Sequence, residues 1–296
     1  MGSLENLYKE AALMQLPLFY VDDVIRTALK EDIHYLDTTT DLMIPAECRT
    51  SARFLAKAEG VVCGLDAALR VFELLDDGFT AEVYRPEGSA VKPGDLIARV
   101  EGHTRALLKG ERTALNLVQH MSGIATATAK AVEKVKGTKA VITDTRKTLP
   151  GLRALQKYAV TVGGGKNHRF NLSDGAMLKD NHIDAAGSIT RAVARLRETY
   201  SPCPPIEVEC RTLDHVREAV AAGADRIMMD NMGAPLLGQA LELVPAHIEA
   251  EVSGGVTLET IRGIALTGPR HPDFISVGRL THSAVAADFS MTLANA

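Results

Sequence analysis

TDTRKTLPGLRALQKYAVTVGGGKNHRFNLSDGAMLKDNHI, residues 143–183, is the stretch that organises the chain. The apolar run 140–142 leads into it and gives way to charged residues 144–147, which indicates a buried strand with charge at its carboxyl end. Two further cationic groups follow, residues 166–169 after three glycines and residues 179–182 after a short apolar run. Because each group follows an apolar run or a glycine turn, we expect one anion-binding site assembled from several segments.

These cations could instead be ordinary solvated residues, since Lys and Arg side chains usually lie in water. Their position at the ends of expected strands favours a binding site. Arginine carries a planar guanidinium that can hold a carboxylate or a phosphate through two bonds at once. The expected ligand therefore carries several negative charges.

The composition is that of an ordinary globular protein, with 46% hydrophobic and 24% charged residues among 296. This length suits one large α/β domain, or one such domain with a smaller partner. A formal net charge of -4 gives no sign of nucleic-acid or membrane binding. The cationic groups stand out against this acidic background, which favours a local site over a broad binding surface.

Cysteine usage and the amino-terminal sequence bear on where the protein resides. The four cysteines, at positions 48, 63, 203 and 210, show no zinc-like or CxxC spacing, so we expect reduced thiols. Residues 1–20 have neither a basic start nor a sustained apolar core, so we expect no signal peptide. No window approaches the roughly 20 apolar residues that a membrane helix needs. We therefore expect a cytoplasmic protein.

The amino-terminal part, up to Val100, predicts a small α+β domain with an antiparallel sheet. Its expected helices are Val21–Lys30 and Leu65–Leu75, and Asp32–Thr40 is expected to be a polar turn. Its expected strands are Ser51–Ala56, Ala81–Tyr84 and Leu96–Val100.

A long helix is expected next, over residues 111–136, from the spacing of its apolar residues. Arg112 would lie near the start of this helix. From the pattern alone, Arg112 is an ordinary surface or salt-bridged arginine.

After Gly137 the chain becomes repetitive. Short apolar runs follow one another at residues 140–142, 176–178, 206–208, 227–229, 248–252 and 274–277, and glutamates interrupt the third and the fifth. Helical patterns separate most of them, at residues 189–199, 213–222, 235–244 and 258–266. This alternation implies parallel strands joined by right-handed crossovers, and six such strands favour an α/β barrel over an open sheet.

Polar residues follow these strands at the point where each one ends. In α/β barrels the loops at the carboxyl ends of the strands form the active site. Glu209 and Asp230 lie on successive expected strands and could face one cavity, where two carboxylates suit a Mg²⁺ held through a phosphorylated substrate. Alternatively, each carboxylate pairs with a neighbouring Lys or Arg.

Two further segments could bind phosphate. Residues 253–255, Ser-Gly-Gly, let a phosphate approach backbone N–H groups ahead of a helix that we expect to begin near Thr257. Gly278 and the residues after it, up to His282 and Ser283, could form a second phosphate cradle. Residues 253–255 could also be a plain turn, and His282 a helix cap or a surface residue.

Several motifs, in order and at suitable spacing, resemble those of one family. They are EDIHYLDTTT, ERTALN, TDTRKTLPGLR, GGGKNHR, LKDNHI, VEC at residues 208–210, MMDNM, EVSGGV and ISVGRLTHSA. The family is that of nicotinate-nucleotide pyrophosphorylase (carboxylating), also called quinolinate phosphoribosyltransferase. The resemblance covers nearly the whole chain.

The resemblance implies a fold: an N-terminal α/β sandwich domain, residues 1–112, followed by an incomplete α/β barrel, residues 113–296, as in type II phosphoribosyltransferases. The C-terminal tail is expected to pack back on the first domain. The implied reaction converts quinolinate and 5-phosphoribosyl 1-diphosphate into nicotinate mononucleotide, diphosphate and CO₂, with Mg²⁺, in de novo NAD biosynthesis. The implied assembly is a homodimer with shared active sites, or a higher oligomer.

The resemblance also assigns roles to residues. The residues expected to bind the quinolinate carboxylates are Arg146, His168, Arg169, Lys179 and, from the neighbouring subunit, Arg112. Those expected to hold phosphate groups are Lys147, Ser253, Gly255, Gly278 and His282. Glu209 and Asp230 would contact ribose hydroxyls and the metal, directly or through water or substrate. The expected catalytic residues are Lys147, Lys179, Glu209 and Asp230, with Lys179 as the candidate general acid.

Two other functions stay open. A related phosphoribosyltransferase could act on another aromatic carboxylate, as a relative associated with molybdenum transport genes would, although the intact group of cations favours a dicarboxylate. A metabolite-binding protein on an inherited barrel would be favoured by a lost site residue, and none of the family's site residues is missing. One departure from the family pattern is Arg279, which adds a charge beside the expected diphosphate cradle.

Overall fold

The computed structural model describes residues 16–294. By contacts, the chain divides into unit 1, which is Met1–Ala129, Thr148–Gly164 and Leu280–Ala296, and unit 2, which is Lys130–Lys147 and Gly165–Arg279. The expected domain boundary between residues 112 and 113 falls inside helix α5 (Thr104–Val135) and stays a prediction. The expectation of no signal peptide falls mostly on residues 1–15, outside the described part. No helix within residues 16–294 is long and apolar enough to cross a bilayer.

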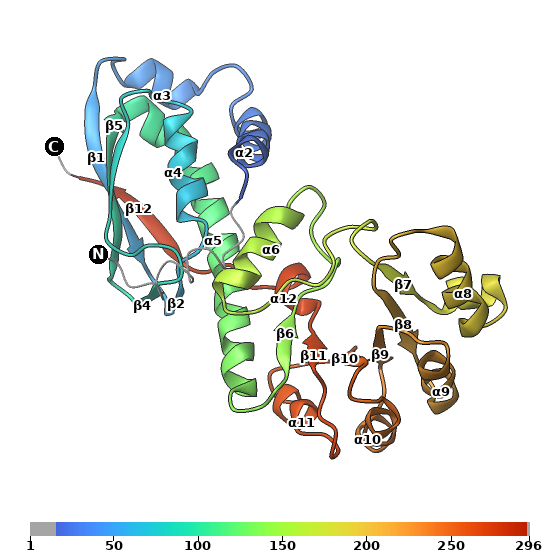
Figure 1. Ribbon diagram of the computed structural model, residues 1–296. Helices are drawn as coiled ribbons and strands as arrows, with labels where there is room; N and C mark the ends of the chain where they lie inside the picture. The colour runs from blue at the N-terminus through green and yellow to red at the C-terminus, as the bar shows by residue number, and fades with distance from the viewer. Residues whose placement is uncertain (1–15, 295–296) are drawn as a thin grey trace, which may run out of the picture. The chain divides into compact units, whose positions relative to one another are not determined.

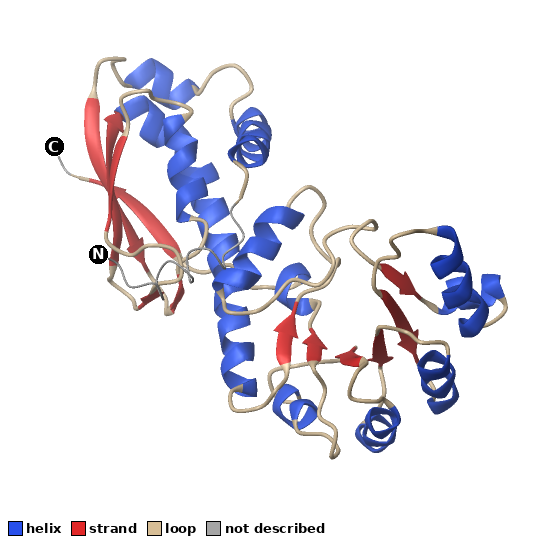
Figure 2. Ribbon diagram, in the orientation of Figure 1, coloured by secondary structure: helices blue, strands red, loops and turns tan. Residues whose placement is uncertain are grey.

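Unit 1 is built on an antiparallel sheet in the strand order β12-β1-β5-β3 (Figures 1 and 2). Its strands are β1 (Arg49–Ala56), β3 (Thr80–Val83), β5 (Leu96–His103) and β12 (Phe289–Leu293), and β2 (Gly60–Val61) pairs separately with β4 (Ala90–Val91). The C-terminal strand β12 pairs with β1 from Ala52↔Leu293 to Ala56↔Phe289, so the end of the chain lies in the amino-terminal sheet. The antiparallel sheet expected from the sequence is confirmed.

The helices of unit 1 are α2 (Leu18–Asp32), α3 (Thr38–Met43), α4 (Leu65–Glu73), α5 up to Ala129, α6 (Arg153–Val162) and most of α12 (Arg279–His282). Two sequence predictions were wrong here. The expected polar turn contains the start of α3, because the Asp37 carboxylate accepts the N–H groups of Thr39 and Thr40 and caps this helix. Helix α5 begins at Thr104, so Arg112 lies about two turns inside it.

Unit 2 holds a parallel sheet in the strand order β6-β11-β10-β9-β8-β7. Its strands are β6 (Val141–Thr143), β7 (Ala176–Leu178), β8 (Ile206–Cys210), β9 (Arg226–Asp230), β10 (Glu249–Ser253) and β11 (Phe274–Ser276). Each corresponds to one predicted apolar run. The consecutive strands β6 and β7 lie at opposite edges of the sheet, which is not closed between them. This is an incomplete α/β barrel, as the resemblance implied.

The helices of unit 2 are the end of α5, α7 (Asp180–Ala186), α8 (Ile189–Thr199), α9 (Leu213–Ala221), α10 (Ala234–Leu243) and α11 (Ile261–Ala265). Figure 1 shows α8 to α11 along the outer side of the curved sheet. Alternate strand residues, such as Ile206, Val208 and Met229, join the apolar core that these helices cover. The residues between them, such as Glu207 and Met228, therefore face the inner side of the sheet.

Two adjacent leucines on α10 test this packing. Leu237 is 2% exposed and belongs to the core, whereas Leu236 is 37% exposed. We expect Leu237→Ala to lower the free energy of unfolding by about 2–5 kcal/mol because it leaves a cavity. Leu236→Ala should lower it by less than about 1 kcal/mol. Urea denaturation measures both values, and equal losses would contradict this packing.

Candidate active site

A cavity of about 290 Å³ lies toward the carboxyl ends of the strands of unit 2. Its lining residues are Thr145, Arg146, Lys147, His168, Arg169, Met177, Lys179, Glu209, Met228, Asp230, Glu251, Ser253 and Ser276. The site residues expected from the sequence that lie together here are Arg146, Lys147, His168, Arg169, Lys179, Glu209, Asp230 and Ser253. Many of the residues that line this cavity could therefore be predicted from the sequence.

The strand order separates the charges in the cavity. Arg146 and Lys147 follow β6, and Lys179 follows β7, so these cations come from the two edge strands. Glu209 lies in β8 and Asp230 ends β9, while hydroxyl groups end β10 and β11. The cations of the cavity thus come from the edge strands and its carboxylates from the inner strands, and the two kinds of charge meet where Lys179 lies 3.6 Å from Glu209.

The loop that carries His168 and Arg169 is fastened to the edge strand β6. Lys166 forms an isolated parallel bridge with the end of this strand. The buried Asp144 carboxylate accepts the backbone N–H of His168 at 2.9 Å and the side-chain amide of Asn167 at 2.6 Å. Because a buried carboxylate needs such donors, Asp144 holds this loop beside the strand. The TDTRK motif therefore supplies an anchor as well as cations.

Arg146 and Arg169 bring two positive charges together. Burial, and then the nearby Arg146, lower the pKa of Arg169. A guanidinium still stays protonated at neutral pH. Arg169 Nη1 donates to the Gly175 carbonyl at 2.8 Å, which fixes the direction of its side chain. An anion that binds to both offsets the repulsion between these like charges, so this pair is suited to a carboxylate or a phosphate.

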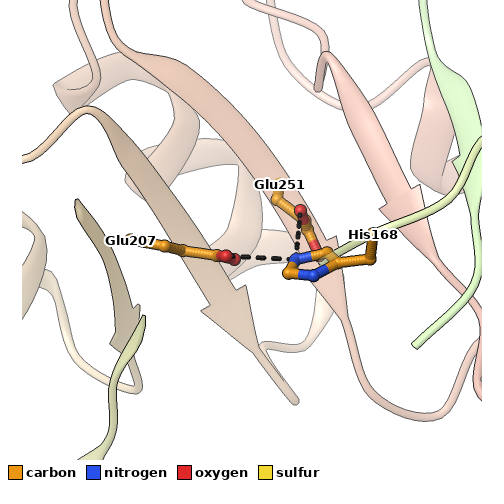
Figure 3. A group of neighbouring side chains, drawn as sticks. All are labelled: His168, Glu207 and Glu251. Atoms are coloured by element: carbon orange, nitrogen blue, oxygen red, sulfur yellow. Dashed lines mark ion pairs between the residues drawn. The ribbon is translucent and has the colours of Figure 1, made fainter. Parts of the chain in front are cut away.

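His168 lies against two buried glutamates that point at it from β8 and β10 (Figure 3). Its Nε2 is 3.0 Å from Glu207 Oε2 and 3.4 Å from Glu251 Oε2. Arg226 Nη1 lies 3.1 Å from Glu251 Oε2. The ligand atoms of the histidine and the two glutamates lie within 4.8 Å of one another, a spacing that could hold a metal ion. Arg226 and a protonated His168 balance the two carboxylates without one, so we treat this group as a closed charge network.

The protonation of His168 follows from its neighbours. Burial alone would lower the pKa of His168, but the carboxylates of Glu207 and Glu251 raise this pKa to about 9. Its Nδ1 lies 2.8 Å from the backbone nitrogen of Arg169, and only the neutral ring can accept this N–H, so the contact opposes a second ring proton. We take the carboxylates as the larger effect because each carries a full charge in a buried site, whereas the amide is only a dipole. A protonated His168 therefore offsets the negative charge of Glu207 and Glu251.

Glu209 and Asp230 share a partner that the sequence analysis missed. Arg211, directly after β8, lies 3.2 Å from Glu209 Oε1 through Nη2 and 3.7 Å from Asp230 Oδ2 through Nε. Lys179 Nζ lies 3.6 Å from Glu209 Oε2. The alternative that each carboxylate pairs with a neighbouring cation is what the structure shows. Both carboxylates therefore face the same guanidinium.

Asn231 joins the loop after β9 to the glycine turn after β10. It has a φ of 54°, and its backbone N–H donates to the Ser253 carbonyl at 2.9 Å. Its Nδ2 donates to Asp230 Oδ2 at 2.9 Å. Gly254 has a φ of 91°, and a Cβ at this position would collide with Asn231 Oδ1. Asn231 therefore holds Asp230 and the turn in fixed positions, and only glycine fits at residue 254.

The expected helix after this turn begins later than predicted. Helix α11 begins at Ile261 rather than near Thr257, because the Thr257 N–H donates to Thr260 Oγ1 at 3.0 Å and closes a turn first. With only 5 residues, α11 offers a weak helix dipole to a phosphate. Phosphate binding here would depend on Ser253 and on Gly255, whose surroundings are open.

Two family models match the chain along most of its length. Quinolinate phosphoribosyl transferase, C-terminal domain, matches residues 124–292, and the N-terminal domain of the same family matches residues 37–122. The chain belongs to the quinolinate phosphoribosyl transferase family. The resemblance seen in the sequence motifs is therefore confirmed.

Individual relatives of this family are similar over nearly the whole chain. A Bacillus subtilis protein named probable nicotinate-nucleotide pyrophosphorylase (carboxylating) is 45% identical over 267 residues, which cover 90% of this chain and 91% of that protein. The Mycobacterium leprae nicotinate-nucleotide pyrophosphorylase (carboxylating) is 42% identical, with coverage of 92% and 96%. The crystal structure of NadC from Streptococcus pyogenes matches with a TM-score of 0.89 at 41% identity, covering 95% of this chain and 100% of that chain.

Four residues expected in the site of this family member do not line the cavity. Gly255 and Gly278 follow lining residues of β10 and β11 by two positions. Arg112 and His282 belong to unit 1, where Arg112 is exposed on α5 and His282 Nδ1 lies 2.6 Å from the hydroxyl of Ser283. The binding roles assigned to these four residues stay predictions.

The residues that the sequence analysis missed left different signals. Glu207 and Glu251 are the glutamates that interrupt two apolar runs, and a charge inside a buried strand is a sign of a polar inner face. Met177 and Met228 could not be predicted as site residues, because the sequence of an apolar run does not show which face of the sheet each apolar residue occupies. Arg211 gave no signal, since its partners come from three separate segments.

The charge network of this family member can be tested by titrating His168. We expect its ring to titrate near pH 9 in the native protein, and at lower pH in Glu251→Gln, which removes one of the two carboxylates that favour the charged ring. Glu249→Gln removes an exposed carboxylate from the same strand and should leave the titration nearly unchanged. NMR of protein labelled with ¹⁵N-histidine measures all three values.

The same shift has a consequence for stability. Because folding raises the pKa of His168 above its ordinary value of 6.5, the protonated ring stabilises the folded protein fully below that pH. This contribution is lost as the pH rises through about 9. A native His168 that titrates near pH 6.5, or an unchanged titration in Glu251→Gln, would contradict the network described here.

Proposed function

We propose that the protein transfers the 5-phosphoribosyl group of 5-phosphoribosyl 1-diphosphate to quinolinate, with release of diphosphate and CO₂, and so forms nicotinate mononucleotide for de novo NAD biosynthesis. The observation that carries this proposal is the meeting of Arg146, His168, Arg169 and Lys179 in one cavity. Two carboxylates on one small ring require such a group of cations. The names of the relatives, nicotinate-nucleotide pyrophosphorylase (carboxylating), support the same reaction.

The cations position the reacting nitrogen of quinolinate. When they hold both carboxylates, the ring can neither rotate nor slide, and its nitrogen is left as the group free to react. Met177 and Met228 give the cavity its apolar lining, which suits contact with an aromatic ring. The protein therefore does not need a nucleophile of its own, because the substrate supplies it.

The bond changes follow from this arrangement. The ring nitrogen forms a bond to the anomeric carbon of the ribose as the bond from that carbon to diphosphate breaks, and diphosphate takes the electron pair. The ring then carries a positive nitrogen, so the adjacent carboxylate leaves as CO₂ and its electron pair stays on the ring carbon. That carbon takes up one proton, for which Lys179 is the candidate donor.

The remaining site residues would hold the phosphoribosyl substrate. Glu209 and Asp230 accept hydrogen bonds and would contact the ribose hydroxyls. The residues proposed to hold its phosphate groups are Lys147, Ser253, Gly255, Gly278 and His282. Basic side chains and backbone N–H groups at these positions would stabilise the charge that develops on the departing diphosphate.

Mg²⁺ is part of this proposal. Glu209 and Asp230 fit a divalent cation, since both offer carboxylate oxygens and both already contact the same guanidinium. They would hold the ion directly, or through water or substrate. When bound, Mg²⁺ supplies positive charge that stabilises diphosphate as it leaves.

We also propose a homodimer, or a higher oligomer, in which Arg112 of one chain reaches the cavity of its partner. The exposure of Arg112 on α5 supports this role, because its guanidinium is accessible to a second chain. Arg112 would then add a further cation for the quinolinate carboxylates. A cytoplasmic location stays a prediction.

The activity is tested with purified protein, quinolinate, 5-phosphoribosyl 1-diphosphate and Mg²⁺. CO₂ and diphosphate should appear in equal amounts. Arg146→Ala should lower kcat/KM for quinolinate by at least about tenfold, because a charge-assisted hydrogen bond is lost. Arg195→Ala, which removes an exposed arginine of α8, should leave it unchanged.

Other outcomes would point elsewhere. Turnover of nicotinate but not of quinolinate would indicate the related transferase with a single-carboxylate substrate. Binding of both substrates without release of diphosphate would indicate a binding protein. Full activity of Arg146→Ala would contradict the proposed role of Arg146 in binding quinolinate.

A further inference from the structure

Arg211 lies between the two carboxylates to which the proposed function assigns the metal. It directly follows the last residue of β8, and its side chain is 52% exposed. Its guanidinium contacts three acids: Asp180 at 2.8 Å, Glu209 at 3.2 Å and Asp230 at 3.7 Å. It therefore already supplies the positive charge that a metal ion would bring to this pair.

The two carboxylates need a cation in this position. The side chains of Glu209 and Asp230 are only 10% and 15% exposed, so water screens their mutual repulsion poorly. Lys179 contacts Glu209 but forms no ion pair with Asp230, so it does not make the bridge that Arg211 makes. Without a divalent ion, Arg211 is what offsets the repulsion within the pair.

Arg211 makes one short contact and two longer ones, so it can leave Glu209 and Asp230 without losing all its partners. Its shortest contact is to Asp180, which begins α7 and does not line the cavity. The guanidinium can keep this contact while it gives up the two longer ones. Asp230 also keeps the hydrogen bond from Asn231 when Arg211 moves, so the carboxylate stays in place.

We propose that Arg211 is a displaceable counter-ion of the metal site, which neutralises Glu209 and Asp230 in the absence of a divalent cation and keeps only its contact with Asp180 when one binds. This inference rests on the proposed function, which places the metal at Glu209 and Asp230. A guanidinium and a divalent cation cannot occupy the same carboxylate oxygens without strong repulsion. The competition therefore weakens metal binding by the native protein.

Binding of Mn²⁺ alone tests this inference, with free Mn²⁺ measured by electron paramagnetic resonance. Arg211→Gln should bind Mn²⁺ about 3 to 10 times more tightly than the native protein, the size expected from losing two partly exposed ion pairs. Arg211→Lys keeps the charge and should bind nearly as weakly as the native protein. Adding Asp230→Asn to Arg211→Gln should abolish the gain, which places the ion at this pair.

The matched control is Arg217→Gln, which removes the same charge from α9, where Arg217 pairs with Asp214 at 2.7 Å. Its affinity for Mn²⁺ should equal that of the native protein. Far-ultraviolet circular dichroism shows which variants are folded, and Arg211→Met replaces Arg211→Gln if the latter is not. The same gain in Mn²⁺ affinity is expected for Arg211→Gln and for Arg211→Met.

Three results would contradict the proposed displacement of Arg211. The first is equal Mn²⁺ affinity of the native protein and the neutral variant, including no detectable binding by either, and the second is weaker binding by the neutral variant. The third is a gain in Mn²⁺ affinity in Arg211→Lys as large as that in Arg211→Gln. The titration uses neither quinolinate nor turnover. Failure of CO₂ and diphosphate release would overturn the proposed function whichever way the Mn²⁺ titration falls, so the two failures can be told apart.

Discussion

A buried charge must have a partner of opposite sign, and this constraint shapes the inner side of the barrel. Glu207 and Glu251 are balanced by His168 and Arg226, while Glu209 and Asp230 are balanced by Arg211 and Lys179. Asp144 uses its carboxylate to hold the loop that brings His168 to this network. Arg146 and Arg169 bring like charges together in the same cavity, and burial and then the nearby Arg146 lower the pKa of Arg169. An anionic substrate that binds to both arginines would offset this repulsion.

The topology brings the opposing charges into one small cavity from different strands. The edge strands β6 and β7 and the loop between them carry the cations, and the inner strands β8 and β9 carry the carboxylates. The parallel register places Asp230 beside Ser253, so the carboxylate of one strand and the glycine turn of the next act together. Asn231 fixes this junction.

Much of this architecture could be predicted from the sequence, because buried parallel strands are mostly apolar and the loops at their carboxyl ends carry the site residues. The runs ending at Ile142, Leu178 and Met229 identify three of the strands and their neighbouring site residues directly. The features that the sequence pattern could not predict depend on contacts between segments that are distant in the chain. Helix α3 is started by the side-chain cap of Asp37, and β12 is a strand because it pairs with β1. Arg211 acquires its role only when α7, β8 and β9 meet.

The most direct test of the proposed quinolinate-binding cations is a crystal structure of the protein with quinolinate bound. Both carboxylates should lie within hydrogen-bond distance of cations from the group Arg146, His168, Arg169 and Lys179, with the ring nitrogen directed toward Glu209 and Asp230. Quinolinate bound with its carboxylates away from Arg146 and Arg169, or outside this cavity altogether, would contradict the account.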